Sequence, residues 1–212
     1  MLTALGALAF VVGFAGAAGG TPAAASNWHV GTYNASGRAL SDGKASSSSG
    51  LATFQFTTTP DIALLTTKQG SQKGNLLGDI TGKTVKATFT IAGTGPFAYY
   101  GQPDACGTPA SVRLFFQTSN AGGFGYTNYW WSNISGGSLV LTNGTSLTVT
   151  ATVSPEQWSD WNGQFGNTVP DGFAAAASNV TDIGLSFGGG CFFENGVGAP
   201  NETFTLNSFT VS

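Results

Sequence analysis

The sequence predicts an all-β protein, a sandwich of two antiparallel sheets with at most one short helix. Apolar and polar residues alternate in many short segments, most clearly at 181–187 and 203–211. Alternation with a period of two leaves one face of a strand buried and the other wet, which is typical of antiparallel sheets. Only 8% of the residues are charged and 32 are glycines, whereas 41% are hydrophobic. This composition suits short strands joined by tight turns, and it is not that of a disordered chain.

The candidate strands follow one another at regular short intervals, which indicates a sandwich or barrel. In chain order they are 27–33, 51–57, 62–67, 84–91, 111–117, 127–133, 138–141, 147–153, 181–187 and 203–211. We expect Val85, Ala87, Phe89 and Ile91 to point into the core. The opposite face of the predicted strands is polar and carries little charge. Its members are Lys86, Thr88, Thr90, Arg113, Phe115, Gln117, Thr148, Thr150 and Thr152.

Three connections have recognisable signatures. Asn143-Gly144 lies between two alternating segments and predicts a β-hairpin of 138–141 with 147–153. Residues 155–168 form a predicted loop with two tryptophans. Residues 170–178 contain four consecutive alanines and predict about two turns of helix.

The two cysteines, Cys106 and Cys191, predict one disulfide. Cys106 precedes the strand at 111–117, and Cys191 follows the strand that ends at Phe187. The two cysteines meet if these strands are antiparallel neighbours. In the chain-entropy model, closing a loop of about 85 residues reduces the conformational entropy of the unfolded chain and so stabilises the folded state by roughly 4–5 kcal/mol.

We expect residues 1–25 to be a secretory signal peptide and 26–212 to be one extracellular domain. Residues 2–18 are uncharged and apolar, with candidate cleavage sites near 17 or 25, although no Lys or Arg precedes them. The net charge of −3 argues against nucleic acid or an anionic membrane as the partner. A monomer is expected.

The segment 80–91 contains Gly82-Lys83-Thr84 followed by an alternating strand. After it come a strand with outward Arg and Gln, an aromatic strand, the strand Gly-Thr-Ser-Leu-Thr-Val-Thr at 144–150, a Trp loop and a closing strand at 204–211. Over roughly 50–212 this order resembles carbohydrate-binding modules with a galactose-binding-like fold. The resemblance implies a jelly roll that binds glycans on a concave face or at its loop tips. Such modules often hold a structural calcium through an Asp in the last strand, where this chain has Asn207.

The predicted function is non-catalytic binding of a neutral polysaccharide. Sugar hydroxyls bind amide and guanidinium groups, and the C–H face of a sugar ring stacks on aromatic rings. Because Trp130 and Trp131 are consecutive in a strand, we expect one in the core and the other exposed. The candidate ligand-binding residues are Arg113, Gln117, Tyr129, Trp130, Trp131, Trp158 and Trp161.

Two other function classes stay open. A polysaccharide-degrading enzyme needs two carboxyl groups across a cleft, and Glu156 with Asp160 is the candidate pair beside Trp158 and Trp161. A structural or adhesive surface protein would also suit the low charge and the edge strands. No cofactor is expected, apart from the calcium that the resemblance raises.

Overall fold

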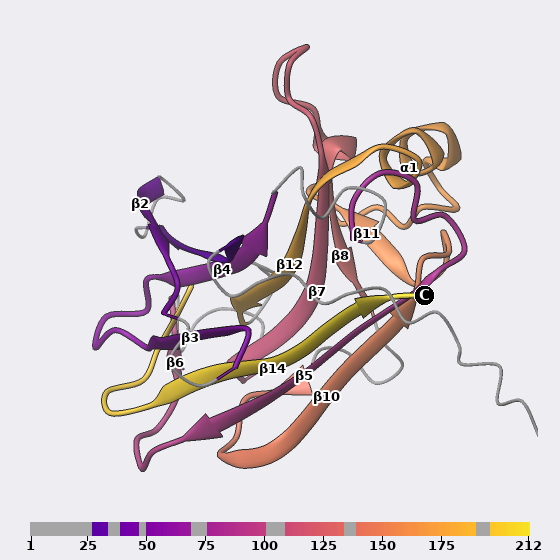
Figure 1. The fold of residues 1–212 in the computed structure, drawn as a ribbon. Helices are drawn as coiled ribbons and strands as arrows, with labels where there is room; N and C mark the ends of the chain where they lie inside the picture. The colour runs from indigo at the N-terminus through magenta and orange to yellow at the C-terminus, as the bar shows by residue number, and fades with distance from the viewer. Residues whose placement is uncertain are drawn as a thin grey trace, which may run out of the picture.

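The computed structural model describes residues 27–33, 39–46, 50–68, 76–100, 109–133, 139–189 and 196–212. These residues form two antiparallel sheets and one α-helix (Figure 1). The predicted all-β sandwich is therefore confirmed. The predicted signal peptide, Cys106 and Cys191 lie outside the described residues.

The larger sheet, sheet A, has ten strands. Its path runs through β11 (Trp158–Asp160), β8 (Tyr129–Ser132), β7 (Ser111–Thr118), β12 (Val180–Gly188), β4 (Ile62–Thr67), β1 (His29–Tyr33) and β2 (Ala39–Lys44). Three two-residue strands lie off this path: β9 (Leu139–Val140) pairs with β7, and β13 (Val197–Gly198) pairs with β4 and with β6 (Ala98–Tyr99). β7 and β12 are antiparallel neighbours, as the cysteine positions predicted.

The smaller sheet, sheet B, has four strands, in the order β10 (Gly144–Thr152), β5 (Thr84–Ala92), β14 (Thr203–Val211) and β3 (Ala52–Gln55). The eight strands β3, β4, β5, β7, β8, β10, β12 and β14 have jelly-roll topology. Counted in chain order, the first, third, sixth and eighth of these strands belong to sheet B. The other four, β4, β7, β8 and β12, belong to sheet A. β1, β2 and β11 extend sheet A at its two edges.

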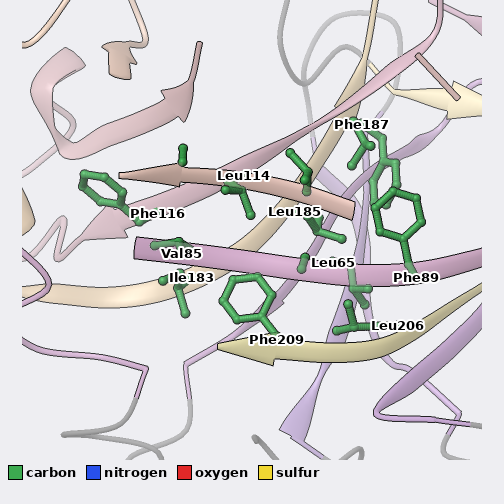
Figure 2. Packing of buried hydrophobic residues seen from close by; sticks show 14 of the residues in the cluster. Leu65, Val85, Phe89, Leu114, Phe116, Ile183, Leu185, Phe187, Leu206 and Phe209 are labelled. Carbon is green, nitrogen blue, oxygen red and sulfur yellow. The ribbon is translucent and has the colours of Figure 1, made fainter. Parts of the chain in front are cut away.

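The core lies between the sheets and is built by the alternation that the sequence shows. Val85, Ala87, Phe89 and Ile91 point into it from β5 and are at most 2% exposed, as predicted. Residues from β4, β7, β12 and β14 complete it (Figure 2). The ring of Phe204 is the centre of an aromatic group, with ring centroids 4.9 Å from Phe89, 5.2 Å from Phe54 and 5.4 Å from Phe187.

Helix α1 (Pro170–Ala177) confirms the predicted short helix. Proline at its start has no backbone N–H that would need a partner, and a phenylalanine and four alanines follow within the helix. Phe173, Ala176 and Ala177 are buried, so the helix closes one end of the core.

The predicted hairpin around Asn143-Gly144 is wrong. β9 pairs with β7 in sheet A, whereas β10 pairs with β5 in sheet B, so this turn carries the chain from one sheet to the other. The side-chain amide of Asn143 donates to the carbonyl of Gly93 at 2.8 Å. The register against β5 shifts between Gly144 and Leu147, where Ser146 has a φ of 59°.

The predicted polar face is in fact two faces. Thr88 and Thr148 lie opposite each other on the outside of sheet B. Arg113, Phe115 and Gln117 lie on the outside of sheet A, because Val112, Leu114 and Phe116 fill the core side of the same strand. A single ligand therefore meets only one of these two sets.

The packing of Phe204 gives a test of the core. We expect Phe204→Ala to lower the free energy of unfolding by about 3–5 kcal/mol, because it removes ring contacts and leaves a cavity. Urea denaturation of the wild type and the variant measures this difference. Phe124→Ala, at a side chain 59% exposed, is the matched control and should change stability by only about 0.5 kcal/mol. Equal losses in both variants would contradict the described core.

Candidate functional site

The outer face of sheet A carries the chemically richest group of side chains. Residues directly opposite each other in an antiparallel pair share a face. Gln117 on β7 lies opposite Tyr129 on β8 and opposite Asp182 on β12. The three side chains thus form one row across the sheet. Tyr129 belongs to an aromatic surface on one side, and Asp182 to a polar depression on the other.

The aromatic surface consists of five side chains, which we call the aromatic patch: Phe124, Tyr126, Tyr129, Trp131 and Trp161. Phe124, Tyr126 and Trp161 are 59%, 54% and 43% exposed. The five rings of the patch form a continuous series of contacts, in which ring centroids are 5.5–5.8 Å apart. The contacting pairs are Phe124–Tyr126, Phe124–Tyr129, Phe124–Trp161, Tyr129–Trp161 and Trp131–Trp161. Such edge-to-face and tilted contacts are favourable geometries for aromatic pairs.

The loop between β7 and β8, which projects beyond the rest of the sandwich, supplies Phe124 and Tyr126 (Figure 1). Hydrogen bonds within the loop fix its base. Asn128 donates to the side-chain oxygen of Asn120 at 2.8 Å, and Asn120 donates to the hydroxyl of Tyr129. The backbone N–H of Trp161 donates to the carbonyl of Tyr126 at 3.3 Å. The patch is therefore ordered by contacts that do not involve a ligand.

The base of the patch continues into a second apolar cluster on the outside of sheet A. Phe115 and Trp131 are 0% and 1% exposed, with ring centroids 5.2 Å apart, and Leu64 packs with them. Trp131 supports the exposed rings rather than offering its own ring to solvent. The expectation that one of Trp130 and Trp131 is exposed is corrected, since neither is.

The polar depression lies on the Asp182 side of the row and has a volume of about 470 Å³. It is lined by Gly31, Tyr33, Ser41, Asp42, Leu64, Thr66, Lys68, Gln117, Thr181 and Asp182. Asp42 is half-exposed and lies 3.7 Å from the Lys68 ammonium and 3.3 Å from Nδ1 of His29. The depression thus brings side chains from β1, β2, β4, β7 and β12 to one place.

Asp182 is the least expected member of this group. It is 9% exposed, and its Oδ1 has no hydrogen-bond partner among the described residues. Burial raises the pKa of Asp182 to about 7, and the nearby Asp42 carboxylate adds to this effect. Lys68 and hydrogen bonds from Thr66 and from the backbone of Ile183 act in the opposite direction. At mildly acidic pH, Asp182 is therefore a neutral carboxylic acid.

A β-bulge aims Asp182 into the depression. The register of β12 against β7 shifts between Val180, opposite Thr118, and Asp182, opposite Gln117. The extra residue, Thr181, lets Val180 and Ile183 both enter the core although they are three positions apart. Thr181 and Asp182 consequently both line the depression. Strict alternation, which the sequence prediction assumed, contains no signal for this arrangement.

The structure divides the predicted binding residues. It brings Gln117, Tyr129, Trp131 and Trp161 together on the outer face of sheet A. Arg113 lies on the same face, where its Nη1 donates to Oδ1 of Asn133 at 2.6 Å. Burial lowers the pKa of the Arg113 guanidinium to about 10, which leaves it charged at neutral pH.

Trp130 and Trp158 are core residues, which corrects their assignment to a binding site. Both are 0% exposed. Their indole N–H groups donate to the carbonyls of Thr127 and Thr152 at 2.7 and 2.8 Å. The predicted loop at 155–168 contains β11, and pairing with β8 turns Trp158 inward. A ligand on the surface does not reach either ring.

The alternative catalytic pair does not form a cleft. Glu156 is exposed, whereas Asp160 is 0% exposed. Oδ1 of Asp160 accepts backbone N–H bonds from Asn162 at 2.9 Å and Gln164 at 2.8 Å, so it holds the turn after β11. In this conformation Asp160 cannot touch a polysaccharide.

Comparisons with protein-family models, curated proteins and solved structures found no match to this chain. Within the described ranges, no group of three or more His, Cys, Asp or Glu side chains is placed to hold a metal ion. Asn207, at the position where the resemblance raised calcium, donates to the hydroxyl of Thr90 at 3.0 Å. No helix of the described residues is long and apolar enough to cross a membrane.

The burial of Asp182 predicts how stability depends on pH. The unfolded chain ionises this group near pH 3.8, whereas the folded protein holds its proton until about pH 7. The folded state binds more protons in this window, so stability falls as pH rises from about 4 to about 7. We expect Asp182→Asn to remove this fall and to be about 2–4 kcal/mol more stable than the wild type at about pH 8.

Urea denaturation at several pH values measures the effect. At about pH 3 the two proteins should have similar free energies of unfolding, because Asp182 is then mostly protonated in both the folded and the unfolded state. Glu156→Gln is the matched control, since it removes an exposed carboxylate. A difference between wild type and Asp182→Asn that does not grow with pH would contradict the described environment of Asp182.

Proposed function

We propose that this protein binds a neutral polysaccharide, without catalysis, on the outer face of sheet A at the aromatic patch. The observation that carries the proposal is the continuous contact of three exposed rings, Phe124, Tyr126 and Trp161, above Tyr129 and Trp131. Soluble proteins seldom leave several large aromatic side chains exposed together unless the surface has a ligand or partner.

The chemistry of the patch suits a sugar chain. Each sugar ring has an apolar C–H face that can stack on an aromatic ring and a rim of hydroxyls that needs polar partners. Gln117, next to Tyr129 in the row, offers both an amide donor and a carbonyl acceptor. Rigid aromatic side chains also lose little conformational freedom when they bind.

The surroundings of the patch favour an uncharged ligand. Only 8% of the residues are charged, and the formal net charge is −3. Arg113, the cation of the predicted site, is already engaged with Asn133. A polyanionic ligand would need a cluster of Lys and Arg, and the seven basic residues of the chain are scattered from Arg38 to Arg113.

Retention on immobilised glycans tests the proposal. We expect the wild type to be retained on at least one of cellulose, xylan, mannan, β-1,3-glucan and chitin. Trp161→Ala and Phe124→Ala should each reduce retention on that glycan by about tenfold or more, because truncation of a binding aromatic typically removes 1–3 kcal/mol. Tyr100→Ala, at an aromatic side chain that is 40% exposed and outside the patch, is the matched control.

Three results would overturn the proposal. The first is no retention on any of the five glycans, and the second is retention that survives loss of both Phe124 and Trp161 in a folded double variant. The third is release of soluble sugar from one of the glycans, because turnover would show an enzyme. Concentration-dependent association without glycan, abolished by Phe124→Ala, would instead make the patch a protein–protein interface.

A further inference from the structure

The polar depression lies directly beside the aromatic patch and is not explained by it. Tyr129, Gln117 and Asp182 form one row across β8, β7 and β12, and neighbouring strands lie about 4.8 Å apart. The row is thus about 10 Å long and connects the exposed rings to the depression. A sugar chain that stacks on the patch and runs along the row reaches Asp182.

Three features mark the depression as a ligand site. It is about 470 Å³ in volume, and its lining includes an amide, a hydroxyl and two carboxyl groups, from Gln117, Thr181, Asp42 and Asp182. Asp182 is 9% exposed, and its Oδ1 has no hydrogen-bond partner among the described residues. A buried polar atom of this kind is expensive unless a ligand or water satisfies it.

We propose that the depression is a second saccharide subsite, in which Asp182 binds as the neutral acid and donates its proton in a hydrogen bond to an oxygen of an uncharged sugar. This inference rests on the proposed function and extends it to a second part of the same surface.

The charges around Asp182 give the reason for the neutral form. From β2, Asp42 faces the same depression, and a second carboxylate there would be repelled by it. Lys68, which follows β4, lowers the pKa of Asp182. Its ammonium also lies 3.7 Å from the Asp42 carboxylate, so its positive charge is divided between the two groups. From β1, Tyr33 lines the depression, and His29, which does not line it, contacts Asp42 at 3.3 Å. From β7 the depression receives the uncharged Gln117.

A bound sugar strengthens this preference. When the ligand covers the depression it removes the remaining water from Asp182, and an ionised carboxylate loses more from desolvation than a neutral acid. Because the pKa of Asp182 is about 7 in the free protein, ionisation begins to compete with binding near neutral pH. Affinity should therefore fall by up to about tenfold for each pH unit above about 7.

The test uses the whole protein labelled with ¹⁵N and five soluble uncharged probes that match the five glycans: xylohexaose, cellohexaose, mannohexaose, laminarihexaose and chitohexaose. Chemical shifts of the Trp161 indole N–H report on the aromatic patch, and those of the Gln117 and Thr181 amides report on the depression. Dissociation constants are measured between about pH 5.5 and about pH 8.5. The variants are Asp182→Asn, which keeps a neutral donor of the same shape, and His29→Gln, which removes the neighbouring histidine.

We expect one hexasaccharide to shift both sets of signals. Its affinity for the wild type should fall by about tenfold or more between about pH 6 and about pH 8.5, as ionisation of Asp182 competes with binding. Asp182→Asn should bind at acidic pH within about threefold of the wild type and lose the pH dependence. His29→Gln should keep the pH dependence, because the proton belongs to Asp182.

The other outcomes separate the two proposals. Shifts at Trp161 alone would leave the aromatic patch as the binding site and overturn the subsite. Shifts at both places with an affinity that is constant or rises with pH would overturn the role of the neutral acid. Loss of the pH dependence in His29→Gln would assign the proton to His29 instead. No shift with any probe would overturn both the subsite and the proposed function.

Discussion

The register of β7 against β12 is the constraint on which both the core and the candidate site depend. These strands form the middle of sheet A and are paired along eight positions. Pairs that face the core alternate with pairs that face outward. The core pairs are Phe116 with Ile183, Leu114 with Leu185 and Val112 with Phe187. The outward pairs are Gln117 with Asp182, Phe115 with Gly184 and Arg113 with Ser186. A slip of one residue would move each set to the other face. The hydrophobic core therefore fixes the position of the candidate site residues on the outer face.

The bulge at Thr181 lets the same strand pairing hold a destabilising group, the buried carboxyl of Asp182. Without the extra residue, either Val180 or Ile183 would leave the core, because residues three apart in a regular strand face opposite sides. Burial of both apolar side chains compensates for the disturbed pairing. The same shift holds Asp182 in a place where its ionised form is disfavoured. Bulges of this kind commonly re-aim a side chain next to a functional site.

The sequence predicted the elements of this fold better than their connections. Period-two alternation identified the long strands, as for Val85 to Ile91, because burial of one strand face acts directly on the residue pattern. It could not show that β9 and β10 belong to different sheets, since Asn143-Gly144 is an equally good turn in a hairpin and in a crossover. Which sheet a strand joins depends on pairing with strands that are distant in the sequence, and local residue patterns do not show this.

The same reasoning explains which parts of the site were predictable. Gln117 could be placed from alternation alone, whereas alternation put Tyr129 on the same face as Trp131 without showing which face of that strand is the outer one. Trp158 could not be placed, because its direction depends on the pairing of the short strand β11 with β8. Phe124 and Asp182 were missed for different reasons. Phe124 lies in a loop without periodicity, and Asp182 follows an irregularity that only the packing of Val180 and Ile183 requires.

The two halves of the candidate surface are held by different kinds of interaction, and this has a consequence for recognition. The aromatic patch stands partly on a loop fixed by a few hydrogen bonds of Asn120 and Asn128. Such a surface can adjust its ring positions to sugars of different shape, because ring stacking tolerates small displacements. The depression is built mainly on strands and their immediate ends, where the backbone ladder fixes Gln117 and Asp182. Hydrogen bonds lose strength steeply when distance and angle change. Under the proposed function, affinity for sugar chains in general would therefore come from the patch, whereas discrimination between one sugar and another would come from the rigid row that ends at Asp182.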